Sequence, residues 1–460
     1  MHIVLVSTPI IYIRKMVTYF HLGILSLHKV LSDAGHECRI YVPYEDAVKK
    51  AEPDTFILRW AEEIAATNPD CVGFSTMCIS YPPTILLAKQ VKRILPQTII
   101  VLGGPQATAV ADESLAAFPW IDYIVRGEAE SAILEFVNVI TEKVKPHETP
   151  NLTYRTNGKI LSTPLGPLLN DLDSLALPDY RAYPHFEEAL IREDNGVKEK
   201  FIPLEAGRGC PYGCCFCSTS SFWQRHRRQK SPEFLAEQIR SVTHKYKIKT
   251  LLLTQDLFAN EGDWLVDFLH AMEGSGEIYW GCAIRPDSVS TQTIAEMHRV
   301  GCRFIFFGIE SGSQRVQKLI GKNLDISRTC QTIEAAVACG INVKISFIIG
   351  FPWEKADDLQ DTLSLHKHFL NLGVESSQVS ILIPMPKTQI TSQYASKLRF
   401  DPIEFAHTTN LEYVRNSEIA RMIRQFPQIF SSFYHLKPEF LSRKEILFAA
   451  RAANALIALR

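Results

Sequence analysis

Hydrophobic and polar positions alternate along the first part of the chain in two kinds of block. Short apolar runs predict β-strands, and longer stretches with apolar residues three or four positions apart predict amphipathic helices. The predicted strands are Ile3–Val6, Cys38–Val42, Cys71–Ser75, Ile99–Leu102 and Tyr123–Val125, and the predicted helices are Leu22–Ala34, Phe56–Thr67 and Pro83–Leu95. Strands that alternate with helices in this way favour an α/β fold built on a parallel, doubly wound sheet.

The same alternation returns after residue 200. Six βα units are too few to close an eight-fold barrel. We therefore expect a partial (β/α)6 barrel whose open side admits a substrate. One of its helices has a clear start, where the capping residue Ser231 precedes Pro232. The predicted strands are Phe201–Glu205, Thr250–Thr254, Tyr279–Ala283, Phe304–Gly308, Val343–Ile349 and Gln378–Ile383.

Two further stretches connect and extend these halves. Asn151–Ile160 has Asn-Gly at its centre and predicts a short hairpin, and the proline-punctuated segment Asp171–Tyr180 predicts a linker. Helical patterns return at Glu412–Gln425 and Leu441–Leu459, the second of which is most simply a packing helix. We expect a Rossmann-like domain at 1–145, a linker with a hairpin at 146–196, a barrel at 197–400 and a helical extension at 401–460.

Composition and charge narrow the range of partners. Of 460 residues, 46% are hydrophobic and 22% are charged, and the formal net charge is −1. No nucleic-acid partner is expected, and the short basic patch Arg225–Lys230 is interpreted as a solvated loop or an edge on the substrate side. The start of the chain shows no signal peptide and no apolar run long enough to span a membrane, so we expect a cytoplasmic protein with reduced cysteines.

Small and turn-forming residues stand at the predicted carboxyl ends of the first group of strands. Ligands of doubly wound sheets bind at these ends, where glycine lets backbone amides come close. No Gly-x-Gly-x-x-Gly motif follows the first strand, so a dinucleotide is disfavoured. The strand-end candidates for ligand contact are Ser75, Thr76, Gly103, Gly104, Gly127 and Glu128.

A C-x3-C-x2-C array of Cys210, Cys214 and Cys217 follows the first strand of the predicted barrel. Glycine and proline around it exclude a regular helix, so the thiols lie on a loop that can wrap a compact object. Three thiolates are one short of the four that close a structural zinc site or a fully protein-ligated cluster. An iron–sulfur cluster with one open iron is therefore favoured. A zinc knuckle with a distant fourth ligand, or chance clustering, is the alternative.

In its strand context, this array resembles that of the radical S-adenosylmethionine superfamily. The resemblance implies that the three cysteines hold a [4Fe-4S] cluster whose fourth iron is chelated by the methionine end of S-adenosylmethionine. It also implies reductive cleavage of this cofactor to a 5′-deoxyadenosyl radical, with an electron from a donor such as flavodoxin or ferredoxin. Cys215 lies outside the spacing and is taken as a non-ligand.

The resemblance extends to other strand ends of the predicted barrel. It implies that an aromatic residue and the fifth strand line an adenine pocket, and that polar groups on the second to fourth strands bind the methionine and ribose. In chain order these residues are Phe216, Asp256, Arg285, Glu310, Ser311, Ile348 and Gly350. The sequence departs from the family pattern at Gln255, where a first aspartate is common, and at Lys387, where glycine is frequent.

Three segments of the first domain, Val72–Ser75, Leu102–Thr108 and Asp122–Glu128, resemble the cobalamin-binding domain attached to many radical S-adenosylmethionine enzymes. The resemblance assigns the six strand-end candidates to cobalamin. The Asp-x-His-x-x-Gly signature of proteins that ligate cobalt through histidine is absent, which implies that the lower face of the corrin has no histidine ligand. A Rossmann-like scaffold without a cofactor is the alternative.

Together these resemblances predict a cobalamin-dependent radical S-adenosylmethionine enzyme. It would transfer a methyl group through methylcobalamin to an unactivated carbon of a small-molecule, lipid or peptide substrate. One alternative is radical cyclisation or rearrangement without methyl transfer, and another is a non-enzymatic cobalamin or redox sensor. A third is a methylthiotransferase with a second cluster on Cys38, Cys71 and Cys78, although Ser7-Thr8 stands where the first cysteine of such a protein is expected.

Overall fold

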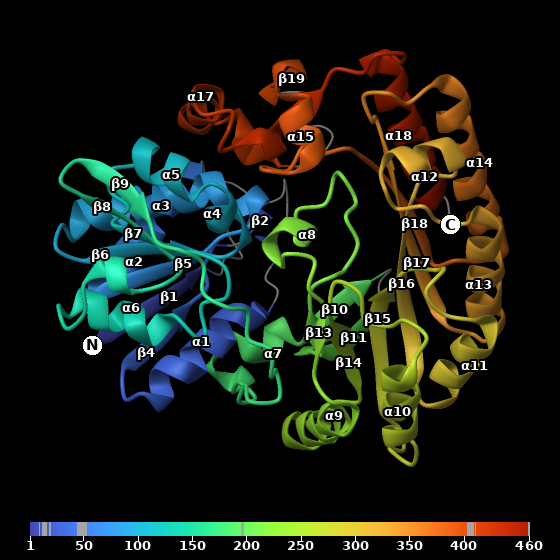
Figure 1. Cartoon of the computed structure of the whole chain (residues 1–460), viewed down its shortest axis with the longest axis horizontal. Coiled ribbons are helices and arrows are strands. Elements are labelled where there is room, and N and C mark those ends of the chain that lie inside the picture. Colours follow the sequence, from blue (N-terminus) through green and yellow to red (C-terminus); the bar gives the residue numbers. More distant parts are fainter. Residues whose placement is uncertain are drawn as a thin grey trace.

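The computed structural model places two α/β halves side by side and joins them with the C-terminal segment (Figure 1). It describes residues 1–8, 10–11, 16–17, 20–43, 53–194, 197–402, 409 and 411–458. Within these ranges, no helix combines the length and the apolar character needed to cross a membrane.

A seven-stranded sheet forms the first half, in the order β4-β1-β5-β6-β7-β8-β9. Its first five strands are parallel, and the strand order reverses at β1, so the carboxyl ends of β1 and β5 flank a topological switch point. The strands are β1 (His2–Ser7), β4 (Glu37–Tyr41), β5 (Cys71–Ser75), β6 (Ile99–Gly103), β7 (Tyr123–Val125), β8 (Leu152–Thr156) and β9 (Lys159–Ser162).

Helices cover both faces of this sheet, and strand β1 shows why its sequence is almost continuously apolar. Ile3 and Leu5 belong to the hydrophobic core on one face, and Val4 and Val6 to the core on the other. The first face is covered by α1 (Leu22–Asp33) and α6 (Ile133–Ile140), and the second by α2 (Pro53–Ala66), α3 (Tyr81–Ile94), α4 (Pro105–Ala109) and α5 (Ala111–Ala117).

The hairpin β8–β9 forms as predicted and turns at Asn157-Gly158. It pairs with β7 and so is the antiparallel edge of the first sheet, whereas the sequence places it in a linker. The segment after it runs to the barrel, where the buried Tyr180 hydroxyl donates a hydrogen bond to the Pro203 carbonyl oxygen at 2.6 Å. The connection is thus packed against the second half.

The second sheet has the order β10-β11-β14-β15-β16-β17-β18. Its six strands from β11 onward are parallel, which confirms the predicted (β/α)6 arrangement, and β10 adds an antiparallel edge. The strands are β10 (Ile191–Asp194), β11 (Val197–Glu205), β14 (Thr250–Thr254), β15 (Tyr279–Ile284), β16 (Cys302–Glu310), β17 (Asn342–Ile349) and β18 (Ser376–Ile381).

Helices line the outer side of this open barrel (Figure 1). The first of them starts at Ser231-Pro232 as predicted, although the Ser231 side chain makes no capping hydrogen bond. The helices are α9 (Pro232–Tyr246), α10 (Asp263–Ala271), α11 (Thr291–Arg299), α12 (Gln314–Leu319), α13 (Ile326–Ala338) and α14 (Ala356–Leu372). Smaller elements are the ribbons β2 (Ile10–Ile11) with β3 (Met16–Val17), β12 (Gly207–Arg208) with β13 (Arg228–Gln229) and β19 (Leu398–Arg399) with β20 (His435–Leu436), and the helices α7 (Phe186–Ala189), α8 (Thr219–Phe222) and α15 (Gln389–Gln393).

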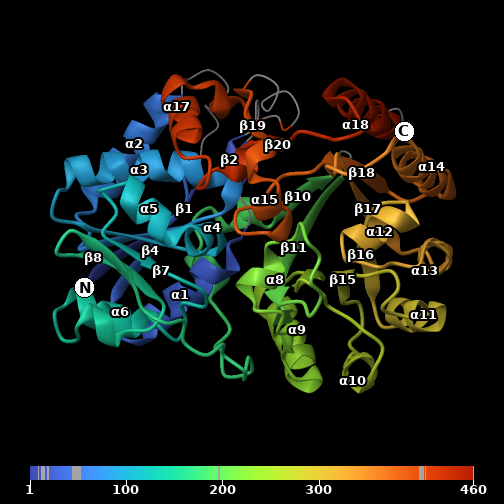
Figure 2. The same cartoon turned by 45° about the horizontal axis from the view of Figure 1, so that its top comes forward.

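The C-terminal segment packs into both halves (Figure 2). Helix α17 (Ser417–Gln425) lies on α3 in the first half, and α18 (Arg443–Ala458) lies on β18 and α14 in the second. The predicted helix Glu412–Gln425 is interrupted at Asn416, whose side-chain oxygen accepts hydrogen bonds from two backbone N–H groups and caps α17. The last predicted helix packs as expected, and its Leu459 lies outside the described residues.

Removal of one buried side chain from α17 tests this packing. Ile423 is fully buried in the core of the first half, so we expect Ile423→Ala to lower the free energy of unfolding by about 2–5 kcal/mol through lost burial and a residual cavity. Arg421 is exposed on the same helix, and Arg421→Ala should change this free energy by under about 0.5 kcal/mol. Urea denaturation followed by circular dichroism measures both. Equal effects would contradict the described packing.

Candidate active site

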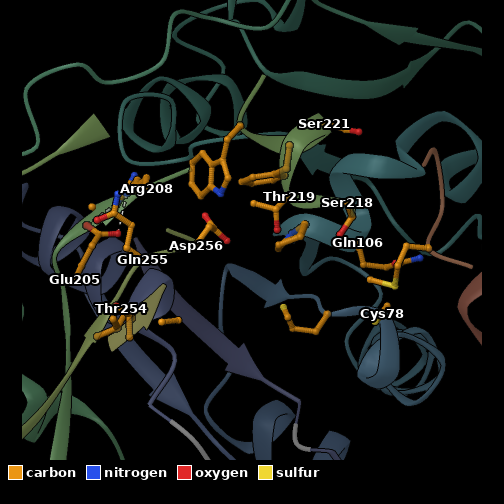
Figure 3. A pocket seen from close by; sticks show the side chains of 18 of the residues that line it. Cys78, Gln106, Glu205, Arg208, Ser218, Thr219, Ser221, Thr254, Gln255 and Asp256 are labelled. Atoms are coloured by element: carbon orange, nitrogen blue, oxygen red, sulfur yellow. Dashed lines mark hydrogen bonds and ion pairs between the residues drawn. The ribbon is translucent and has the colours of Figure 1, made fainter. Parts of the chain in front are cut away.

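A cavity of about 1000 Å³ lies between the carboxyl ends of the two sheets (Figure 3). The first half contributes the loops after β5 and β6, and the barrel contributes strand ends, α8 and the loop after β18. The lining includes Leu22, Met77, Cys78, Pro105, Gln106 and Thr108 from the first half and Glu205, Arg208, Trp223, Thr254, Gln255, Asp256, Ala283, Phe304, Phe306 and Met385 from the second. A space of this size and mixed lining suits organic ligands as large as cofactors.

The three cysteines of the array come together on the loop between β12 and α8. All three thiols are free and half-buried, and they lie near enough for the charge on one to act on another. Burial raises the pKa of the Cys214 thiol to about 11, whereas the nearby cations Lys322 and Arg285 favour its thiolate. In the described part of the chain, no three His, Cys, Asp or Glu side chains, these cysteines included, surround the position of a single metal ion. Three free thiols on one loop, with two cations nearby, nevertheless provide the type of thiolate donor that an iron–sulfur cluster needs.

Asp256 fixes the start of the cysteine loop. Its carboxylate accepts a hydrogen bond from the Gly209 N–H at 3.0 Å, and burial raises the pKa of Asp256. Gly209 has a φ of +85°, and a Cβ there would lie 1.9 Å from the His226 carbonyl oxygen, so only glycine fits. Asp256 also lines the cavity, and it therefore joins the loop to the ligand space (Figure 3).

Arg285 lies against the cysteine loop from the end of β15. It makes two ionic hydrogen bonds to Asp287, at 2.8 and 2.9 Å, and donates to the Lys322 carbonyl oxygen at 2.8 Å. Its guanidinium stacks on the Tyr212 ring, 3.8 Å from the centroid. The third nitrogen, Nη1, is buried with no hydrogen-bond partner among the described residues. An oriented guanidinium with a spare donor suits a ligand carboxylate.

Glu310 is the last residue of β16 and Ser311 follows it, but the two side chains lie in different surroundings. The Glu310 carboxylate accepts a hydrogen bond from Lys322 Nζ at 2.7 Å, and its backbone has a φ of +71°, a strained value for this residue type. Ser311 is fully buried, its hydroxyl lies 3.1 Å from that of Thr362, and it accepts from the Ser313 N–H at 3.1 Å. The Ser311 side chain thus supports the turn from within the protein.

Phe216 and Ile348 pack on a small hydrophobic cluster that also contains Cys215. Phe216 meets Phe351 edge to face with ring centroids 6.0 Å apart. Gly350 follows β17 with a φ of +87° and faces Ile446 of α18. Phe216 and Ile348 thus lie beside the cysteine loop, with Cys215 turned into the protein.

Thr76, Gly103 and Gly104 contact one another at the carboxyl ends of β5 and β6, which we call the mouth of the first sheet. The Thr76 hydroxyl donates to the Gly103 carbonyl oxygen at 2.7 Å and accepts from the Ala107 N–H at 2.9 Å. Gly104 has a φ of +91°, and a Cβ there would lie 2.9 Å from the Thr76 carbonyl oxygen. Ser75 is half-buried beside them. This close backbone packing directs the start of α4, with Pro105 and Gln106, into the cavity.

Gly127 and Glu128 lie away from that mouth. The Gly127 N–H donates to the Thr108 hydroxyl at 3.0 Å. Glu128 is 6% exposed, and its carboxylate accepts hydrogen bonds from Arg208 and Arg228 at 2.8–2.9 Å and from the Leu169 N–H at 2.8 Å. The structure therefore places the Glu128 carboxylate in the interface between the halves, and it does not line the cavity.

Arg208 is the centre of this interface network. Besides Glu128 it binds Glu130 at 2.6 Å, which also comes from the first half, and Glu205 at 2.8 Å from its own strand end. Arg208 and Arg228 both stack on the Trp223 ring, with guanidinium carbons 6.0 and 5.4 Å from its centroid. Two buried arginines and three carboxylates thus join the halves next to the cysteine loop (we call these five residues the interface network).

The basic patch Arg225–Lys230 is only partly exposed. Arg228 and Lys230 are 8% and 4% exposed, so the interpretation of this patch as a solvated loop is wrong for both residues. Lys230 donates to Gln238 at 2.6 Å, and burial lowers the pKa of Lys230 to about 8. Arg225 and His226 are exposed.

Sequence reasoning missed several residues of the site. Lys322 and Tyr212 hold Glu310 and Arg285, but no spacing rule marks a lysine after a short helix or a tyrosine inside the array. A usable signal was present for Phe304 and Phe306, which line the cavity from β16, because alternate residues of a strand point to the same face.

Loss of one carboxylate tests the interface network. We expect Glu128→Ala to leave the buried Arg228 without its carboxylate partner, while Arg208 keeps Glu130 and Glu205, and to lower the free energy of unfolding by about 3–5 kcal/mol. Glu135 is exposed on α6, and Glu135→Ala should change it by under about 0.5 kcal/mol. Urea denaturation measures both variants. Unchanged stability of Glu128→Ala with weakened cobalamin binding would instead favour the cofactor contact predicted from sequence.

Glu354 generates a pH dependence of stability. Burial raises the pKa of Glu354 from its ordinary value of 4.5 to about 7, so the folded protein holds this proton more tightly than the unfolded chain does. Glu354 therefore destabilises the fold increasingly as pH rises from about 4.5 to 7. Relative to the unaltered protein, Glu354→Gln should have similar stability near pH 4 and a free energy of unfolding about 3 kcal/mol higher at pH 8, measured by urea denaturation. An equal change at both pH values would contradict this cause.

Two protein-family models match the chain on either side of the cavity. The B12 binding domain matches residues 14–137, and the radical SAM superfamily matches residues 204–366. An uncharacterised methyltransferase of Pyrococcus horikoshii is 27% identical over 393 residues, which cover 83% of this chain and 82% of that protein. The anaerobic magnesium-protoporphyrin IX monomethyl ester cyclase of Rubrivivax gelatinosus is 24% identical over 400 residues, which cover 84% of this chain and 70% of that protein.

Solved structures show the same fold over nearly the whole chain. A radical S-adenosylmethionine methyltransferase from Kitasatospora setae, solved with cobalamin and a [4Fe-4S] cluster bound, superposes with a TM-score of 0.68 at 14% identity, and the match covers 99% of this chain and 89% of that one. The two family models occupy the two halves that share the cavity. The chain therefore combines a B12 binding domain, at residues 14–137, with a radical SAM domain, at residues 204–366.

Proposed function

We propose that this enzyme is a cobalamin-dependent C-methyltransferase, which cleaves S-adenosylmethionine reductively and transfers a methyl group to an unactivated carbon. The observation that carries the proposal is one cavity bordered by the carboxyl-end loops of both sheets. When bound, the cluster and S-adenosylmethionine supply a carbon radical and cobalamin supplies the methyl group. Both must reach one substrate atom, and a shared cavity provides that proximity.

Different residues of the barrel would bind the cluster and the parts of S-adenosylmethionine. Cys210, Cys214 and Cys217 would hold the cluster, because their thiols are free, mutually close and flanked by cations. Arg285 has its side chain fixed by Asp287, and its unpartnered Nη1 would bind the methionine carboxylate.

The apolar cluster at Phe216, Ile348 and Gly350 would hold the adenine. Phe216 and Ile348 pack on the cluster that contains Cys215 but are themselves half-buried, so each keeps an accessible part on which a planar ring could pack. The Lys322–Glu310 pair would bind the polar part of the same cofactor.

The cobalamin would lie on the first half of the cavity. Close packing at Gly104 sets the loop so that Gln106 and Met77 line the space, and a corrin needs this mixture of polar and apolar contacts. No histidine is present among the described residues of the lining.

Apolar side chains of the barrel would protect the reactive species. Phe304, Phe306 and Leu252 line the interior part of the cavity, and such a lining limits water around a bound radical. The substrate would therefore enter from the open side of the barrel and place its reacting carbon between these rings and the first half.

Radical cyclisation is a second candidate function. The similarity to a cyclase from Rubrivivax gelatinosus covers as much of this chain as the similarity to the methyltransferase does. The products separate the two. Methyl transfer yields S-adenosylhomocysteine and a product heavier by one methylene, whereas cyclisation yields neither.

Anaerobic reconstitution with iron, sulfide, S-adenosylmethionine and cobalamin tests the proposal. We expect 5′-deoxyadenosine and S-adenosylhomocysteine after addition of dithionite, with about four irons per chain and the absorbance of bound cobalamin. Formation of 5′-deoxyadenosine without S-adenosylhomocysteine would favour cyclisation. Absence of both, in a protein loaded with all cofactors, would contradict the enzymatic proposal.

Adjacent cysteines give a matched pair of variants. Cys214→Ala should reduce 5′-deoxyadenosine to background because one cluster ligand is lost, and cobalamin binding should persist because the first half is untouched. Cys215→Ala should retain cleavage, since Cys215 faces the hydrophobic cluster. Iron content, product chromatography and cobalamin absorbance measure these effects. Retained cleavage in Cys214→Ala would overturn the ligand assignment.

A further inference from the structure

Two phenylalanine side chains are left partly uncovered inside the barrel. Phe304 and Phe306 come from β16 and line the cavity, and Phe306 is 37% exposed, although a barrel interior is normally filled by packed side chains. Leu252 of β14 and Ala283 of β15 line the same space. Apolar surface of this kind is favourable to cover, because a ligand that packs on it removes it from water. The barrel interior therefore fits an apolar group.

The charged residues of the described lining have partners within the protein. Arg208 pairs with Glu205 at 2.8 Å, and Lys387 pairs with Glu113 of α5 at 2.5 Å. The Asp256 carboxylate accepts the backbone hydrogen bond that fixes the cysteine loop. None of these charges needs a ligand to neutralise it, and an ion that is buried without a partner is costly. The space thus disfavours a charged group.

The side chain of Gln255 has a hydrogen-bond donor to spare. Gln255 lines the cavity just after β14 and is 9% exposed. Its Oε1 accepts a hydrogen bond from Gln229 Nε2 at 3.3 Å and would lie 2.7 Å from a Cβ at Gly207, so the amide is closely held. Its Nε2 is buried and has no hydrogen-bond partner among the described residues. A buried N–H without an acceptor is unfavourable, so a ligand that supplies an oxygen acceptor gains from it.

The polar neighbours of Gln255 already use their hydrogen-bonding groups. Glu205, Thr254 and Gln255 lie together on one side of the cavity (Figure 3). The Thr254 hydroxyl donates to the Leu204 carbonyl oxygen at 3.2 Å, and the Glu205 carboxylate is bound by Arg208. Of these three lining residues, Gln255 is the one with a donor for a ligand.

We propose that the substrate enters the barrel as an uncharged, largely apolar group with an oxygen acceptor, and that the Gln255 amide orients this group by donating a hydrogen bond. The inference rests on the proposed function and names the class of substrate for the same cavity. Burial against Phe304 and Phe306 would hold the group, and one directed hydrogen bond would fix which of its carbons faces the first half. Carboxylates, phosphates and ammonium groups would stay outside this part of the cavity.

Three naphthalenes test the class of ligand by equilibrium dialysis against the protein loaded with cluster and cobalamin. We expect 2-acetylnaphthalene, which is uncharged and carries a carbonyl oxygen, to bind most tightly. Naphthalene lacks the acceptor and should have a Kd about fivefold higher, and the anion 2-naphthoate should have a Kd at least about tenfold higher. Binding of 2-naphthoate as tight as that of 2-acetylnaphthalene would overturn the proposal, as would absence of binding by all three. This comparison needs no variant.

Two variants assign the binding to this part of the cavity. Gln255→Leu should raise the Kd of 2-acetylnaphthalene about fivefold and leave that of naphthalene nearly unchanged, because only the hydrogen bond is lost. Phe306→Ala should raise both Kd values about fivefold through lost apolar contact. Leu161 is 44% exposed on β9 in the first half, and Leu161→Ala should change neither. Equal changes for both compounds in Gln255→Leu, or no change in Phe306→Ala, would overturn the proposal.

The inference and the proposed function can fail separately. Dialysis requires no turnover, whereas the proposed function is judged by 5′-deoxyadenosine and S-adenosylhomocysteine. The expected order of binding in a protein that forms neither product would contradict the proposed function and support the assignment of the ligand class. Formation of both products by a protein that binds 2-naphthoate most tightly would support the proposed function and overturn the ligand class.

Discussion

The buried interface network is the interaction on which the arrangement of the two halves depends. Arg208 stands two residues before Cys210, the first cysteine of the array, and binds carboxylates from both halves. Removing these charges from water is costly, so the network contributes less to net stability than to geometry, because only one docking of the halves pairs all of its charges. Trp223 closes the network on the cavity side, where both arginines stack on its ring. The position of the cysteine loop relative to the first sheet is thereby fixed by charge pairing and not by a flexible hinge.

Hydrophobic packing supports the same arrangement from two other places. Tyr180 in the connection bonds to the first barrel strand and packs against Phe20 of the first half, with ring centroids 5.6 Å apart. The C-terminal segment closes the opposite side, where Gln106 donates to the Ile429 carbonyl oxygen at 2.8 Å. Because Gln106 lines the cavity, the tail supports the ligand space as well as the fold.

Much of the fold could be predicted from the sequence because each strand carries its own signal. β5, β7 and β14 have the predicted bounds, and the Asn157-Gly158 turn forms where its dipeptide indicates. Glycine positions were equally informative, since Gly209 and Gly104 adopt backbones that other residues avoid.

The partners of buried charges could not be read in the same way. Glu128, Arg208 and Arg228 are far apart in the sequence, and each alone has the character of a surface residue. Only the docking of the halves makes them partners, so the sequence assigned Glu128 to a cofactor and Arg228 to solvent. Ser311 illustrates a similar limit, because its position after β16 is visible in the sequence, whereas its burial under Thr362 is not.

The place of the tail has a consequence for the order of events during synthesis. Residues 411–434 complete the hydrophobic core of the first half, yet they leave the ribosome after the barrel does. The first half therefore emerges with an uncovered apolar surface on α3 and waits for the barrel to be made before that surface is closed. The part of the cavity that the first half contributes, which this segment supports through Gln106, is complete only after the segment has been made. Assembly of the cavity is thus a final step of folding, after both halves have formed.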